Sequence, residues 1–168
     1  FASEIYRLPF LSTSHSPIQI DDLERVLINL VNPETVAGVV IEPIQGEGGF
    51  NVPKNGFLEK IKELCQKYGM LFIADEIQCG MGRTGKFFAV EHWNIEPDII
   101  CLAKALASGL PLSAVISRKE ITDALPMGTI GGTYVGNPLG CQAALEVIRI
   151  IQEEDLLNKA VNIGTIIK

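Results

Sequence analysis

The sequence predicts an α/β protein of one domain, residues 1–168, folded as a three-layer sandwich around a mostly parallel sheet. Short apolar runs of strand length alternate along the chain with longer stretches in which apolar residues recur at helical spacing. The apolar runs are continuous rather than alternating, which is typical of parallel strands covered by helices on both faces. Hydrophobic residues make up 47% of the chain, enough for one buried core.

Three stretches have the periodicity of a helix with one buried stripe. The first spans Asp21 to Val31, the second spans about Pro53 to Tyr68, and the third starts near Pro138. The residues expected to face inward on the third helix are Cys141, Ala144, Leu145, Ile148 and Ile151. The acidic run Glu153 to Asp155 at its outer end is expected to be a solvated face.

Four apolar runs have the length of strands. They are Gly38 to Glu42, Leu71 to Ala74, Asp98 to Leu102 and Ala114 to Ser117. In an open sheet of this kind, ligands bind outside the carboxyl ends of the parallel strands. Residues that directly follow the strands are therefore the candidates for chemistry.

Charge and composition exclude several kinds of partner. The net charge of −6 and the pI of about 4.9 leave no basic surface for a phosphate backbone, so no nucleic acid partner is expected. The longest apolar stretch, Ile99 to Ile116, is interrupted by Lys104, Gly109 and Pro111, so no membrane-spanning segment is expected. Four separated cysteines without a C-x-x-C pair indicate buried free thiols in a reducing compartment, the cytoplasm or, in a eukaryote, the mitochondrial matrix.

The stretch Gly80 to Phe87, GMGRTGKF, fits seven positions of the phosphate-binding pattern G-x-x-x-x-G-K. Two features argue against a nucleotide loop. Phe87 stands where the pattern needs a Ser or Thr for magnesium, and the loop closely follows the strand that ends in Asp75-Glu76 instead of preceding it. The stretch is therefore predicted to be a flexible glycine-rich turn, in which Arg83 is available to pair with a carboxylate.

Three successive predicted strands deliver polar side chains to one edge of the sheet. The first runs into a loop that contains Glu47, the second into Asp75, and the third into Lys104. A lysine followed by small residues is expected to be partly desolvated, which makes its neutral amine accessible for Schiff-base chemistry. An aspartate that ends a buried strand can pair with a pyridinium nitrogen and keep it protonated. Taken singly, Lys104 also fits a snorkelling edge lysine, and Asp75 a turn cap.

Four segments carry a resemblance to a known family. They are VVIEPIQGEGGF, LFIADEIQCGMGRTGKFFAVE, PDIICLAKALASGLPLSAVI and GGTYVGNPLGCQAALEVI. In this order and without large gaps, over about residues 36 to 168, they resemble the class III aminotransferases, which have fold type I and use pyridoxal 5'-phosphate. The resemblance implies that the chain is the central part of the large cofactor-binding domain, with the family's N-terminal segment and C-terminal small domain outside it.

The resemblance assigns roles to individual residues. Lys104 matches the lysine that holds the cofactor covalently and then moves the proton, and Asp75 matches the partner of the pyridine nitrogen. Ile77 falls where the family places a branched apolar residue against the ring, and Gln78 where a glutamine bonds near the ring hydroxyl. Thr133 matches the threonine that reaches the cofactor phosphate of the neighbouring subunit, which implies a homodimer or larger assembly with a shared site.

The implied reaction transfers an amino group from 4-aminobutyrate to 2-oxoglutarate, giving succinate semialdehyde and glutamate. Glu47 matches the glutamate that pairs with an active-site arginine, so that one pocket accepts both an ω-amine donor and a dicarboxylate. Two alternatives stay open: another donor, ornithine or acetylornithine, and an inactive truncated domain with only a binding or structural role. No metal is implied. His15 and His92 match no catalytic position, so each is expected to be a surface or packing residue.

Overall fold

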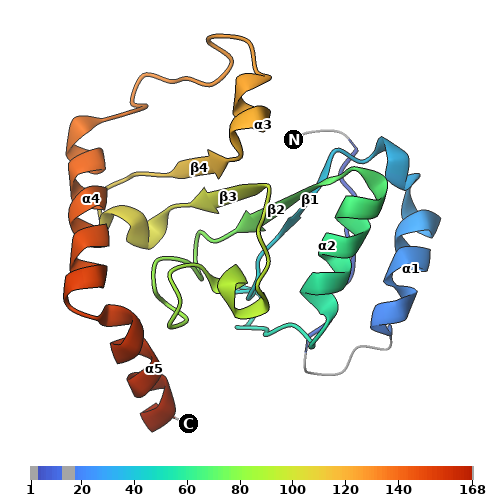
Figure 1. Cartoon of the computed structure of the whole chain (residues 1–168), viewed down its shortest axis with the longest axis horizontal. Helices are drawn as coiled ribbons and strands as arrows, with labels where there is room; N and C mark the ends of the chain where they lie inside the picture. The colour runs from blue at the N-terminus through green and yellow to red at the C-terminus, as the bar shows by residue number, and fades with distance from the viewer. Residues whose placement is uncertain (1–3, 13–17, 168) are drawn as a thin grey trace.

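A computed structural model describes residues 4–12 and 18–167 of the chain. A four-stranded sheet lies in the middle, with α1 and α2 on one side of the view in Figure 1 and α4 on the other. The strands are β1 (Gly38–Ile41), β2 (Leu71–Asp75), β3 (Ile99–Leu102) and β4 (Ala114–Ser117). They lie side by side in chain order, with β1, β2 and β3 parallel and β4 antiparallel to β3. The predicted α/β class with a mostly parallel sheet is confirmed.

The three predicted helices correspond to α1, α2 and α4, and the other helices of the structure were not predicted. The helices are η1 (Ile20–Asp22), α1 (Leu23–Leu30), η2 (Pro33–Thr35), α2 (Phe57–Tyr68), η3 (Ala89–Trp93), η4 (Lys104–Ala107), α3 (Lys119–Asp123), α4 (Pro138–Glu153) and α5 (Leu156–Ile167). The second predicted helix begins at Phe57 and not at Pro53, because Gly56 before it takes a left-handed φ of 84°. The third ends at Glu153, at the predicted acidic run, and the left-handed Asp155, with φ 52°, separates it from α5, which was not predicted.

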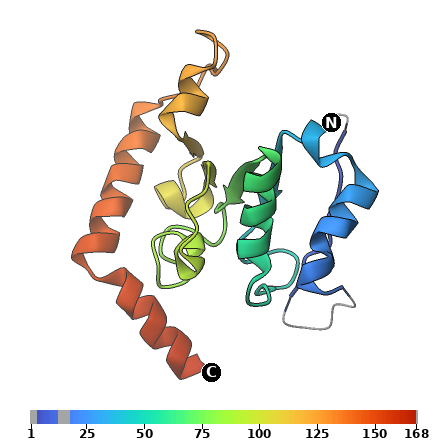
Figure 2. The same ribbon diagram turned by 45° about the vertical axis from the view of Figure 1, so that its right-hand side comes forward.

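One face of the sheet carries the core. Ala74 lies beside Ile100 in the register, and Ile100 lies beside Ile116, so these side chains share one face. Ala74 packs in a cluster with α1 and α2, and Ile100 packs in a second cluster with α4. In Figure 2 the segment that contains η3 lies between α2 and α4 and completes this layer.

The opposite face is open over the described residues. Val40 on β1 is 65% exposed and Val115 on β4 is 70% exposed. Both strands nevertheless have the continuous apolar sequence of strands covered on two faces. The described residues therefore supply two of the three layers that the sequence predicts. No helix within the described ranges is long and apolar enough to cross a membrane.

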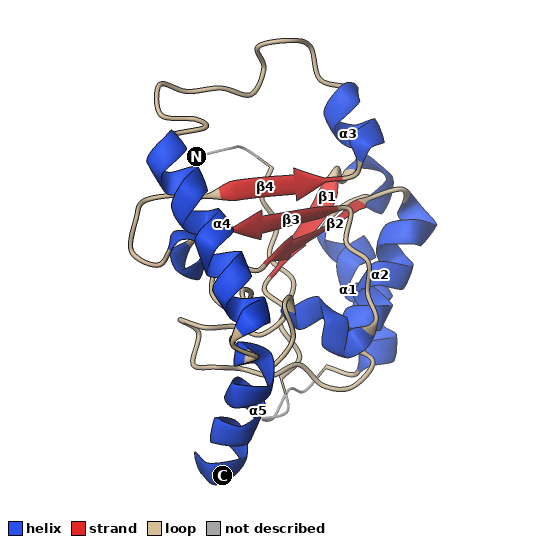
Figure 3. Cartoon of the chain, turned by 60° about the vertical axis from the view of Figure 1, so that its left-hand side comes forward, coloured by secondary structure: helices blue, strands red, loops and turns tan. Residues whose placement is uncertain are grey.

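Helix α4 buries a narrower stripe than its sequence indicates. The prediction was right for Ala144 and Ile151, which are buried, and for Ile148, which packs against the same cluster. It was wrong for Cys141 and Leu145, which are exposed. The reason is that α4 packs mainly on η4 and on α5, near the ends of β3 and β4 (Figure 3), and not across the full sheet.

Candidate active site

Lys104 directly follows β3 at the carboxyl edge of the parallel strands. Its backbone is left-handed, with φ 45°, and it opens the short helix η4. A non-glycine residue in this region costs on the order of 1 kcal/mol, and such strain is concentrated at functional sites. The sharp turn leaves the Lys104 side chain exposed at the edge. The expected desolvation of Lys104 is therefore not found within the described residues.

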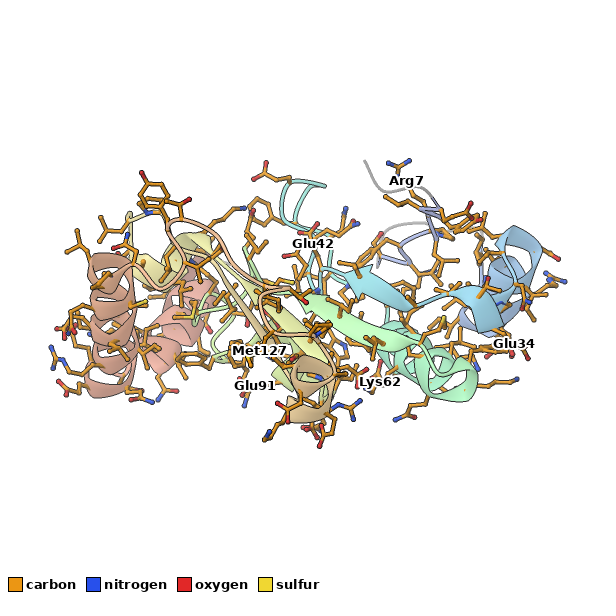
Figure 4. The ribbon with its side chains drawn as sticks, turned by 90° about the horizontal axis from the view of Figure 1, so that it is seen from above. Arg7, Glu34, Glu42, Lys62, Glu91 and Met127 are labelled. Atoms are coloured by element: carbon orange, nitrogen blue, oxygen red, sulfur yellow. The ribbon has the colours of Figure 1, made fainter. Side chains whose placement is uncertain are left out.

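A contact network joins the ends of β1, β2 and β3. Nζ of Lys104 donates a hydrogen bond to Oε1 of Gln78, in the turn after β2. The Gln78 carboxamide lies against Gly46, in the loop after β1, where an added Cβ would be 2.3 Å from Cδ of Gln78. The backbone N–H of Gly46 donates to Oε2 of Glu42 over 2.9 Å. Figure 4 labels Glu42 near this loop. Residues far apart in sequence thus form one edge.

A pocket of about 430 Å³ opens beside this network. Lys104, Gln78, Arg83, Thr84 and Phe50 are among its lining residues. Its described lining has two cationic side chains, from Lys104 and Arg83, and no carboxylate. Arg83 is exposed and forms no ion pair with a described residue. The pocket therefore suits a ligand that carries an anionic group.

Asp75 ends β2 and pairs in the register with Cys101 of β3. Its Oδ1 accepts a hydrogen bond from the backbone N–H of Ile77 over 3.1 Å, so the turn-cap interpretation is correct for one oxygen. No described residue donates to its other oxygen. Asp75 lines a neighbouring pocket of about 580 Å³ together with Glu42. Burial, and then the charge of Asp75, raise the pKa of the Cys101 thiol.

The other predicted site residues lie apart from Lys104. Ile77 is half-buried in the turn after β2. Glu47 and Thr133 are exposed, do not line the 430 Å³ pocket, and form no hydrogen bond with a described residue. Thr133 lies on the long loop between α3 and α4, which Figure 3 shows extending away from the strands. The structure thus brings together Lys104, Gln78 and, one pocket away, Asp75.

Glu76 is a site-supporting residue that the sequence analysis assigned no role. Its side chain is 1% exposed. Oε1 accepts from the backbone N–H of Val90 over 2.8 Å, and Oε2 accepts from Ala89 over 3.0 Å and from Sγ of Cys79 over 3.2 Å. A carboxylate directly after a buried strand was the available signal. Glu76 fixes the turn between β2 and η3, which carries Arg83 to the pocket rim.

The segment Gly80 to Phe87 is a glycine-rich turn, as predicted. Met81, Gly82 and Gly85 are all left-handed, and the N–H of Gly82 donates to the carbonyl of Phe87 over 3.2 Å. The turn leads into η3, which is only five residues long. The short 3-10 helix η3 is not the α-helix whose N-terminal amides bind phosphate in a nucleotide loop, and this agrees with the rejection of that interpretation.

The structure places one of the two histidines and all four cysteines, and their exposure can be compared with the prediction. His92 is exposed, and its Nε2 lies 3.1 Å from both the carbonyl and the Oγ1 of Thr84, so it packs against the glycine-rich turn. His15 lies outside the described residues. Cys65 and Cys79 are buried as predicted, whereas Cys101 is half-buried and Cys141 exposed. No cluster of metal ligands occurs within the described ranges.

Comparison with known proteins identifies the family. The family model of class-III aminotransferases matches residues 1–168. The chain is 47% identical over 178 aligned residues to a probable 4-aminobutyrate aminotransferase of Bacillus subtilis, covering 100% of this chain and 41% of that protein. It resembles the crystal structure of ornithine aminotransferase from Toxoplasma gondii with TM-score 0.80 and 43% identity, over 88% of this chain and 34% of that one.

A second solved structure, acetylornithine aminotransferase from Elizabethkingia anophelis, matches with TM-score 0.81 and 43% identity, over 88% of this chain and 37% of that one. The chain therefore belongs to the class III aminotransferases. It spans 41% or less of the length of these relatives. The relatives carry three different substrate names, so the comparisons establish the family and leave the amino donor to be tested.

Class III aminotransferases use pyridoxal phosphate as their cofactor. The residues at the carboxyl edge fit this group chemically. The amine of Lys104 can bind an aldehyde, and the amide of Gln78 can form a hydrogen bond with a ring hydroxyl. The carboxylate of Asp75, which uses one oxygen to accept from the N–H of Ile77, can pair with a pyridine nitrogen through the other. The bare Cα of Gly46 leaves room for the Gln78 carboxamide at this edge.

Proposed function

We propose that this chain provides the cofactor-binding part of an aminotransferase that moves an amino group from 4-aminobutyrate to 2-oxoglutarate. The observation that carries the proposal is the position of Lys104, directly after β3 and hydrogen-bonded to the neutral amide of Gln78. The similarity to the Bacillus subtilis protein, a probable 4-aminobutyrate aminotransferase, supports this choice of donor.

The chain's residues divide the work of proton transfer. When bound, pyridoxal phosphate supplies an electron sink for the carbon that loses its proton. Lys104 would hold the cofactor until the amine of the donor replaces it, and the freed Nζ would then take the proton from the substrate carbon and return it. The carboxylate of Asp75 would keep a proton on the pyridine nitrogen. Gln78 orients Nζ of Lys104 through its Oε1.

The remaining roles depend on groups outside the described residues. We assign Ile77 to packing against the cofactor ring, and Thr133 to the phosphate bound by the neighbouring subunit of a homodimer. Exposure of Thr133 on a long loop supports that assignment. Glu47, exposed in the loop after β1, is assigned to pair with an arginine and thereby admit both substrates. The buried free thiols of Cys65 and Cys79 support a cytoplasmic location.

The proposal is tested by measuring kcat/KM for 4-aminobutyrate, 5-aminovalerate, ornithine and acetylornithine, each with 2-oxoglutarate, in the natural full-length protein. The proposed function predicts the highest value for 4-aminobutyrate. A preference for ornithine or acetylornithine, the substrates named for the two solved structures, would replace the donor and keep the reaction class. Absence of turnover with every donor would favour a binding or structural role.

A further inference from the structure

Gly46 is a buried glycine whose backbone does not require glycine. It lies in the loop after β1, outside the set of residues with a left-handed φ. Its N–H is fixed by Oε2 of Glu42 over 2.9 Å. An alanine at position 46 therefore keeps an allowed backbone and keeps the hydrogen bond to Glu42. What glycine provides here is space.

The side chain of Gln78 occupies the space that a Cβ on Gly46 would fill. A Cβ on Gly46 would lie 2.3 Å from Cδ, 2.3 Å from Nε2 and 2.8 Å from Oε1 of Gln78, well inside van der Waals contact. All three atoms are at the end of a flexible side chain, so the Gln78 carboxamide would move while the backbone stays in place. The fold tolerates a side chain at position 46, but the present position of Gln78 does not.

That position determines the partner of Lys104. Oε1 of Gln78 accepts the hydrogen bond from Nζ of Lys104. We propose that Gly46 is a positioning residue: its bare Cα is the surface on which the Gln78 carboxamide rests, and Glu42 holds this surface in place. Gly46 thereby sets the direction of the Lys104 amine. The inference rests on the proposed function and adds to it a residue that touches neither cofactor nor reacting atoms.

The test is Gly46→Ala in the natural full-length protein, with the dissociation constant of pyridoxal phosphate, the pH titration of the bound cofactor's absorbance, and kcat/KM as readouts. Misplacement of the Lys104 amine by about 1 Å predicts a loss of kcat/KM on the order of 100-fold and a displaced titration. The melting temperature should stay within about 2 °C of the parent's, because only a side-chain end moves. Gly48→Ala is the matched control, since its Cβ would crowd the end of another flexible side chain, with Oε1 of Gln45 3.2 Å away, and Gln45 does not line the 430 Å³ pocket. The control variant should behave like the parent.

A second background separates positioning from a general structural effect. In a Gln78→Ala protein there is no carboxamide to displace, so adding Gly46→Ala should cause no further change in any readout. Three results would overturn the inference: the same loss on adding Gly46→Ala to the parent and to the Gln78→Ala protein, an equal fall in melting temperature in both, or no loss in the parent that keeps Gln78. If the parent protein itself fails to bind pyridoxal phosphate at Lys104, the proposed function fails instead.

Discussion

The two ends of the sheet each have a pocket lined by a lysine and an arginine, and they differ in how those charges are paired. At the amino end, Lys62 and Arg118 lie 3.3 Å and 2.5 Å from the carboxylate of Asp98, which also accepts from the N–H of Phe72 over 2.7 Å. That pocket measures about 470 Å³. At the carboxyl end, Lys104 has one hydrogen-bond partner among the described residues, a neutral amide.

The difference separates a structural cluster from a reactive one. Asp98 is 6% exposed and ties β2, α2 and the start of α3 together, so both cations are fixed against one buried carboxylate. Lys104 keeps its charge unpaired by any described carboxylate, and its backbone is strained. Size does not separate these two pockets in favour of the reactive one, because the amino-end pocket is the slightly larger of the two.

The largest expected effect is that of Lys104→Ala on activity. Loss of the residue that holds the cofactor and moves the proton should lower kcat by about 10⁴-fold. Unfolding in urea should be unchanged within about 0.5 kcal/mol, because Lys104 is exposed. Lys86→Ala, also exposed and outside the 430 Å³ pocket, is the control and should keep full activity. Equal losses in both variants would contradict a specific catalytic role for Lys104.

The amino end should show the opposite behaviour. Asp98→Ala leaves Lys62 and Arg118 without their shared carboxylate and the buried N–H of Phe72 without its acceptor, and it should lower the free energy of unfolding by about 1–3 kcal/mol. The folded fraction should retain the parent's kcat. Urea unfolding gives the first quantity, and active-site titration with pyridoxal phosphate gives the second. Normal stability combined with lost activity would mean that the amino end of the sheet takes part in the reaction, and this would contradict its structural role.

Asp75→Asn sharpens the comparison within the carboxyl end. The asparagine keeps the shape of the side chain and can still accept from the N–H of Ile77, but it removes the negative charge. We expect kcat to fall by about 10²-fold, the usual cost of removing one electrostatic contact to the reacting group. Steady-state kinetics at saturating cofactor provides the measurement. An unchanged kcat would mean that Asp75 acts only as a cap of the turn after β2.

The smallest effect concerns alkaline pH. Burial, and then the charge of Glu76, raise the pKa of the Cys79 thiol from 9.0 to about 12. Because the folded-state pKa is raised, the stabilisation is complete below pH 9 and is lost as the pH rises from 9 toward 12. The loss should reach about 1 kcal/mol by pH 10. Urea unfolding of the parent and of Cys79→Ala across this range should give curves that differ in slope, and parallel curves would contradict the assignment.

Much of the fold could be predicted because continuous apolar runs identify buried strands without reference to their partners. The direction of β4 was not predicted, because a four-residue apolar run does not show its own direction. The connection from Leu102 to Ala114 is too short for a crossover helix, and this is the sequence feature that could have indicated the antiparallel return of β4. The helix that follows Asp155, α5, was not predicted.

The candidate site was predicted in part for a similar reason. Lys104 and Asp75 follow strands directly, so the topology of a parallel sheet brings them to one edge whatever the loops do. The contact between Gly46 and Gln78 depends on the shape of two loops, and no periodicity encodes it. The predicted desolvation of Lys104 failed because it requires groups packed above the edge, which the described residues do not supply.

The most direct test of the contrast between the two ends is borohydride reduction of the protein in the presence of pyridoxal phosphate, followed by peptide mapping. Labelling confined to Lys104, and absent from a Lys104→Ala variant, is the predicted result. Lys62 at the amino end is the internal control and should remain unlabelled, because Asp98 holds its amine. Scattered labelling over surface lysines, identical in the variant, would contradict the assignment of the carboxyl edge as the active site.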